Sequence, residues 1–114
     1  MAFFFVNSRM TIQEKYQELL ARHPDVELKG KNLLYTSLNG HMYSQTNKDG
    51  QLGLRLSKED GAEFIEKHNS EPFKSYGAFM RGYVLVPEAV LADHAEIDRY
   101  FRRSIEFIKT LEPK

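Results

Sequence analysis

The stretch Asn39–Ser57, which reads NGHMYSQTNKDGQLGLRLS, contains two tight-turn signatures and decides the fold. Asn39-Gly40 supplies two residues that tolerate a positive φ, which a two-residue hairpin loop requires. Asn47-Lys48-Asp49-Gly50 fits a type I turn closed by a glycine bulge. Alternating runs flank both turns, so we predict a three-stranded antiparallel meander on which the rest of the chain packs.

The turns set the strand register of this meander. A two-residue first loop pairs Thr36 with Tyr43, and a three-residue second loop pairs Tyr43 with Arg55. One face of the sheet then carries a column of leucines, and we expect helices to cover it as the core. Its residues are Leu33, Tyr35, Met42, Ser44, Thr46, Leu52, Leu54 and Leu56. The opposite face carries Leu34, Thr36, Leu38, His41, Tyr43 and Arg55. A four-residue second loop is the alternative, and it would move the leucine column to the side of Tyr43 and His41.

Helix caps are visible in the sequence on both sides of the meander. Thr11 and Glu14 have the spacing of a capping box, which predicts a first helix that ends before Pro24. Ser57 is suited to cap a second helix, and Asn69 is suited to end it in a left-handed conformation. We expect these helices to pack on the sheet.

The second half of the chain completes the predicted domain. Asn69–Ala78 lacks a regular period and is expected to be a loop with aromatic anchors. Phe79–Val86 is aromatic and branched, which predicts a fourth strand. Pro87–Leu91 suits a short helix before Asp93 caps the last helix, whose apolar arc is wider than one core requires. We therefore predict a single α+β domain over residues 1–114, with an antiparallel sheet, flanking helices and the order α-β-β-β-α-β-α.

The composition excludes several classes of protein. Sixteen basic and sixteen acidic side chains cancel, so we expect no nonspecific DNA binding, which usually requires a strongly basic surface. A basic strip on the last helix, formed by Arg99, Arg102, Arg103 and Lys109, keeps nucleic-acid binding open as a further hypothesis, although a solvated face is the simpler explanation. The chain has no cysteine, which rules out thiol chemistry and disulfides. The apolar Phe3–Val6 run is too short to span a bilayer and lacks the features of a secretory signal. We expect a cytoplasmic protein with no membrane association.

No set of residues in the sequence indicates a catalytic, cofactor-binding or metal-binding site. The best candidate for a ligand or partner surface is His41, which follows a sharp turn and lies two residues from Tyr43 on the same predicted strand face. Arg55 is one strand away, and Tyr76 lies in the aromatic loop. A solvated sheet face with a tyrosine–arginine pair explains the same residues without any ligand.

Several segments together resemble the TfoX N-terminal domain family in their order and spacing. They are Asn39–Ser44, Lys48–Gly50, Leu52–Leu56, Pro72-Phe73, Tyr76–Met80, Tyr83–Pro87 and Tyr100–Ser104. The resemblance covers about Gly30 to Leu111 and implies a compact α+β domain with an antiparallel sheet, flanking helices and frequent dimers. Full-length TfoX proteins are associated with regulation of DNA-uptake competence and carry a second, C-terminal domain that this chain lacks. No catalytic residue set carries over from the family.

The function expected from these observations is a non-enzymatic regulatory or protein-interaction module that acts as a homodimer. The alternative is a small-molecule-binding or weakly catalytic domain that uses the His41, Tyr43 and Arg55 face of the sheet. We expect no cofactor in either case.

Overall fold

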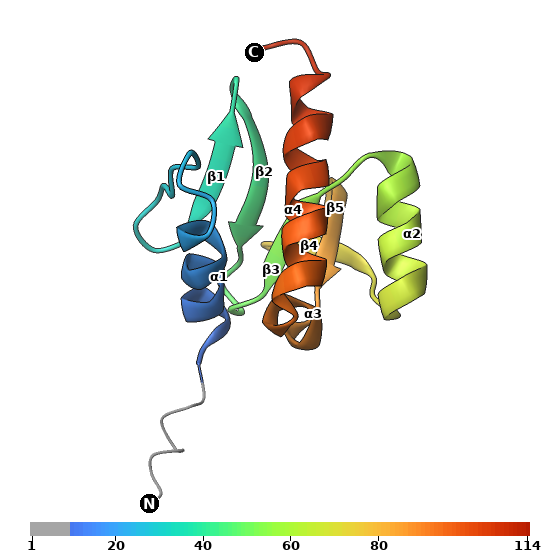
Figure 1. Ribbon diagram of the computed structural model, residues 1–114. Helices are drawn as coiled ribbons and strands as arrows, with labels where there is room; N and C mark the ends of the chain where they lie inside the picture. The colour runs from blue at the N-terminus through green and yellow to red at the C-terminus, as the bar shows by residue number, and fades with distance from the viewer. Residues whose placement is uncertain (1–9) are drawn as a thin grey trace, which may run out of the picture.

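The computed structural model describes residues 10–114, so the Phe3–Val6 run lies outside the described residues. The described chain has an α+β fold with an open, five-stranded antiparallel sheet and flanking helices (Figure 1). The helices are α1 Ile12–Ala21, α2 Lys58–His68, α3 Glu88–Ala92 and α4 His94–Lys109. The strands are β1 Tyr35–Leu38, β2 His41–Thr46, β3 Leu52–Arg55, β4 Pro72–Ser75 and β5 Ala78–Val86. The predicted fold class is therefore confirmed.

The strands lie in the order β1-β2-β3-β5-β4. Thr46 pairs with Leu52, and Gln45 pairs with Gly53, which confirms the three-residue second loop and excludes the four-residue alternative. Helix α4 runs along one face of the sheet, with α1 on one side of it and α2 on the other (Figure 1). The leucine column of β3 is buried beneath these helices, as predicted.

A β-bulge in β2 corrects the predicted faces of the first hairpin. Leu38 faces His41 as expected, but Thr36 pairs with Ser44 rather than with Tyr43, so β2 holds one extra residue. Such a residue reverses the inside–outside alternation beyond it. The side chains of Leu34, Thr36, His41 and Tyr43 are therefore buried, whereas Met42, predicted to be in the core, is 37% exposed.

The caps place the helices where the sequence predicts them. Thr11 and Glu14 form both hydrogen bonds of the capping box on α1. The Ser57 side chain accepts a hydrogen bond from the backbone N–H of Asp60, and Asn69 ends α2 in the left-handed region at φ 52°. The Asp93 side chain caps α4. Local hydrogen bonding alone fixes these ends.

The prediction of a loop over Asn69–Ala78 is wrong, because this stretch contains β4. The strand is too short and too polar to show a period, and a tertiary contact holds it. The fully buried Phe73 ring lies against Gly53, where a Cβ atom would stand only 2.3 Å from the Phe73 Cδ2 atom. The absence of a side chain at Gly53 therefore leaves the space that the Phe73 ring occupies, which allows β4 to pack on the sheet.

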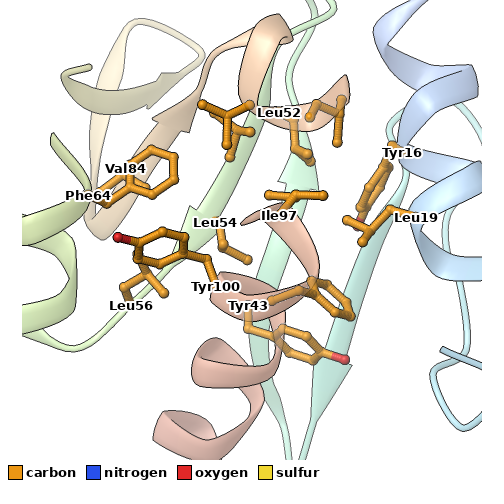
Figure 2. Packing of buried hydrophobic residues seen from close by; sticks show 14 of the residues in the cluster. Tyr16, Leu19, Tyr43, Leu52, Leu54, Leu56, Phe64, Val84, Ile97 and Tyr100 are labelled. Atoms are coloured by element: carbon orange, nitrogen blue, oxygen red, sulfur yellow. The ribbon is translucent and has the colours of Figure 1, made fainter. Parts of the chain in front are cut away.

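The core lies between the sheet and the helices (Figure 2). Tyr100 on α4 meets Phe64 of α2 edge-on, at 4.9 Å between the ring centroids. At the α1 end, the core includes hydroxyl groups: Ser44 shares hydrogen bonds with Tyr16 Oη at 2.6 Å and with Thr36 Oγ1 at 2.5 Å. None of the described helices combines the length and apolar character that crossing a bilayer requires.

Candidate functional site

The structure separates the four residues that the sequence placed on one candidate surface. His41 and Tyr43 are not exposed: His41 retains 9% of its accessible surface and Tyr43 retains 3%. The His41 Nε2 atom lies 2.7 Å from the backbone carbonyl oxygen of Glu112, so the C-terminal tail covers the ring. The Tyr43 ring packs against Phe101 of α4, at 5.7 Å between centroids. The prediction that this face is open to solvent is wrong for both side chains, because the bulge turns them inward.

Arg55 and Tyr76 remain accessible but lie in different places. Arg55 ends β3, and its guanidinium group stands over the Phe107 ring at 5.8 Å. Tyr76 lies in the turn between β4 and β5 and is 72% exposed. The structure therefore brings no two of the four predicted residues together as a ligand-binding cluster.

A groove lies between α2 and β5. Its volume is about 850 Å³, and Arg55 is the one predicted candidate that lines it. Apolar side chains form much of its wall, namely Ala62, Ile65, Phe79, Met80, Val84 and Phe107. A concave, mostly apolar surface of this size is typical of binding sites.

The β4–β5 turn beside this groove presents exposed aromatic residues. Phe79 is 65% exposed and lies under the ammonium group of Lys74, whose Nζ atom is 4.7 Å from the ring centroid. Tyr76 has φ 53° and Gly77 has φ 77°, so both turn residues lie in the left-handed region. This region is unfavourable for a bulky residue, and strain of this kind occurs often at functional sites.

A second cavity lies between the α1–β1 connection and α4. Its volume is about 480 Å³, and Tyr43, Leu38 and Ile105 contribute to its wall. Lys29 and Lys109 provide cations at this cavity, and Asp25 and Glu27 balance them, while Arg22 at its wall is already paired with Asp98. The cavity therefore has mixed polarity without a dominant charge.

Carboxylates on the other side of α2 hold the helices together. The Glu96 carboxylate binds Lys67 Nζ at 2.8 Å and His68 Nε2 at 2.7 Å, which joins α2 to α4. The hydrogen bond from Lys67, supported by one from Arg99, lowers the pKa of Glu96 to about 2. Burial and the hydrogen bond to Glu63 raise the pKa of Tyr100 to about 12. These groups are already paired within the fold, which is typical of structural ion pairs.

Within residues 10–114, no group of three or more histidine, aspartate or glutamate side chains is arranged to hold a metal ion. His41, which the sequence favoured, donates a hydrogen bond from Nε2 to the backbone carbonyl oxygen of Glu112, and its Nδ1 atom is buried without a described partner. It therefore lacks the substrate access that an acid or base needs.

Sequence reasoning missed the groove residues Phe79, Met80 and Arg81. The sequence predicts a strand for these residues, and a strand pattern alone does not indicate that they line a groove. The signal that could have found them is Tyr76-Gly77, which has the same place between two strands as Asn39-Gly40. A hairpin there would have placed Phe79 near the free end of the sheet.

No protein-family model, curated protein or solved structure matches this chain.

Proposed function

We propose that this chain is a TfoX N-terminal-like domain that works as a non-enzymatic protein-interaction module in a regulatory setting, and that it acts as a homodimer. The observation that carries the proposal is the exposed aromatic pair Tyr76 and Phe79 on a strained turn beside an apolar groove. Large exposed apolar patches on soluble domains mark surfaces that meet other proteins.

Two further features favour association. The formal net charge is zero, so long-range repulsion does not oppose the approach of two copies. Aromatic residues are enriched in the centres of protein interfaces, because they bury a large area at a small entropic cost. A homodimer built on the β4–β5 turn would bury the side chains that are otherwise the most exposed large apolar groups described.

Sedimentation equilibrium at tens of micromolar tests this proposal. We expect the mass of a dimer for the wild-type chain and a shift towards monomer for Phe79→Ser. Met42→Ser is the matched control, because Met42 is a second exposed apolar residue that lies away from the β4–β5 turn. A monomeric mass for the wild-type chain would count against the homodimer, and equal effects of the two substitutions would remove the assigned interface.

A small-molecule-binding domain is the second candidate function, and the cavity beside Tyr43 favours it. Its volume of about 480 Å³ is sufficient for a small organic ligand. Differential scanning fluorimetry against a panel of organic acids and amines provides a test. A ligand that raises the melting temperature of the wild-type chain should fail to do so in Ile105→Trp, which fills the cavity.

A further inference from the structure

The groove between α2 and β5 carries a charge pattern that packing does not require. Three cationic residues line it, namely Arg55, Lys58 and Arg81, and no acidic side chain of the described chain does. None of the three forms an ion pair with a described residue. The groove therefore carries positive charge that no described carboxylate neutralises.

Two arginines on the neighbouring face of α4 are paired within the fold. There Arg99 binds Glu96 at 2.9 Å, and Arg103 binds Glu63 at 3.1 Å. Both arginines also stand over the Tyr100 ring, so their guanidinium groups are fully engaged. Arg55, in contrast, stands over the Phe107 ring and near Tyr83, and no described carboxylate pairs with it. The groove cations remain available to an external carboxylate.

The backbone along the groove is also open. β5 pairs with β4 at Ala78, Phe79 and Val84, and Met80 and Arg81 lie in the irregular stretch of this ladder. On the other side of β5, β3 ends at Arg55 opposite Tyr83, so it does not extend alongside Met80 and Arg81. β3 ends beside this point, and its last contact is the hydrogen bond from the Leu56 N–H to the Gly82 carbonyl oxygen at 3.1 Å. Unpaired strand backbone of this kind can accept an added strand.

We propose that this groove binds an acidic, amphipathic peptide segment of a partner protein in an extended conformation along β5. The proposal rests on the function proposed above and names the chemistry of the partner. Alternate side chains of an extended peptide point to opposite sides. Apolar side chains then enter the wall formed by Ile65, Met80 and Phe107, while carboxylates reach Arg55 and Arg81. Charge complementarity gives the orientation, and apolar burial gives most of the affinity.

Fluorescence anisotropy with a short fluorescein-labelled peptide, in which glutamate alternates with leucine or phenylalanine, tests the proposal. We expect saturable binding that weakens as the salt concentration rises, since exposed charges are screened. The same peptide with lysine in place of glutamate should not bind. Arg55→Glu and Arg81→Glu should each raise Kd by about two- to fivefold or more, as expected for charged pairs at the rim of an interface.

Matched variants separate the groove from general charge effects. Lys48→Glu makes the same charge change in the exposed β2–β3 turn and should leave Kd unchanged. Ala62→Trp fills the groove without changing its charge and should abolish binding. Hydrogen exchange provides an independent measurement, because strand addition should protect a backbone amide within the Met80-Arg81 stretch. Circular dichroism and melting temperature confirm that each variant is folded.

The contrary outcomes are distinct. Equal binding of the glutamate and lysine peptides, equal effects of Arg81→Glu and Lys48→Glu, or unchanged exchange at Met80 and Arg81 would each overturn the proposal. Anilinonaphthalene sulfonate that binds the groove but is not displaced by the peptide would assign the site to small anionic amphiphiles instead. Charge reversals that change the sedimentation mass without any peptide binding would assign it to a second copy. A monomeric chain that binds the peptide contradicts the homodimer alone, and a dimer that does not bind contradicts only this inference.

Discussion

The two hairpins at the ends of the sheet have the same turn but opposite surroundings. Asn39-Gly40 between β1 and β2 and Tyr76-Gly77 between β4 and β5 both place two consecutive residues at positive φ. The first turn is covered by the C-terminal tail, where the Lys114 N–H donates to the Asn39 carbonyl oxygen at 2.9 Å. The second turn projects with its tyrosine 72% exposed.

The backbone conformation of a turn and its exposure to solvent therefore have separate causes in this protein. Asparagine followed by glycine is the favoured choice for this turn, and the first hairpin uses it. The second hairpin uses tyrosine in a conformation that bulky side chains rarely adopt, with no buried contact in return. Tyr76 therefore does not stabilise its own turn. Its exposed ring is better explained by a contact with another molecule.

Removing the Phe73 ring should have the largest effect, because this ring attaches the second hairpin to the sheet. Phe73 is fully buried on Gly53, and Phe73→Ala should reduce the free energy of unfolding by about 3–5 kcal/mol. Urea denaturation measures this change. A loss below about 1 kcal/mol would mean that β4 does not depend on this contact.

The first hairpin should depend on polar contacts instead. Ser44→Ala leaves the hydroxyl groups of Tyr16 and Thr36 without their shared partner in a buried site, which should cost about 1–3 kcal/mol. The double-mutant cycle with Tyr16→Phe isolates the pair, because Ser44→Ala should cost less once the Tyr16 hydroxyl is absent. Additive effects of the two substitutions would show that the bond at 2.6 Å contributes little.

Acid should loosen α2, which borders the groove beside the second hairpin. The folded-state pKa of Glu96 is lowered from 4.5 to about 2, so its contribution to stability is present above pH 4.5 and is lost as the pH falls towards 2. Lys67 and Arg99 are 50% and 37% exposed, so solvent screens the ion pairs, and we expect the contribution to be about 1 kcal/mol.

Glu96→Gln provides the measurement. Wild type and variant should differ in urea stability at neutral pH and converge as the pH approaches 2. A difference that stays constant across this range would show that the carboxylate charge is not the cause.

The smallest effect should come from Tyr76, and it should have the opposite sign. Tyr76→Asn places a residue that tolerates φ 53° in the turn, which should increase the free energy of unfolding by about 0.5–1 kcal/mol. The same change should weaken the proposed self-association. A more stable protein with unchanged sedimentation mass would show that the tyrosine has no role in the interface.

The sequence predicted the elements with strong local signals. The capping residues Thr11, Ser57 and Asp93 act within one turn of chain, so their helices form where the pattern indicates. The three-residue turn before Gln51 likewise fixed the register of β2 and β3. The strand β4 was missed, because its position depends on the space left by Gly53, far away in sequence.

The candidate surface was predicted less well than the fold, and one residue explains most of the error. The extra residue in β2 turns Tyr43 towards α4 and His41 towards the C-terminal tail. The sequence around Thr36 and Ser44 contains no local pattern that predicts this bulge. Arg55 is accessible, and its partners in the groove come from α2, β4, β5 and α4. Residues from five separate elements cannot be grouped before their packing is known.

The chain by itself determined where helices start and stop, where the strands reverse and that the leucines of β3 face the core, because each of these depends on neighbours a few residues away. Only the tertiary structure decided the bulge in β2, the seat of Phe73 and the collection of unpaired cations at the groove. These features depend on contacts between segments that are distant in sequence. Local preferences allow several arrangements there, and close packing of the side chains, such as the Phe73 ring in the space left by Gly53, selects one of them.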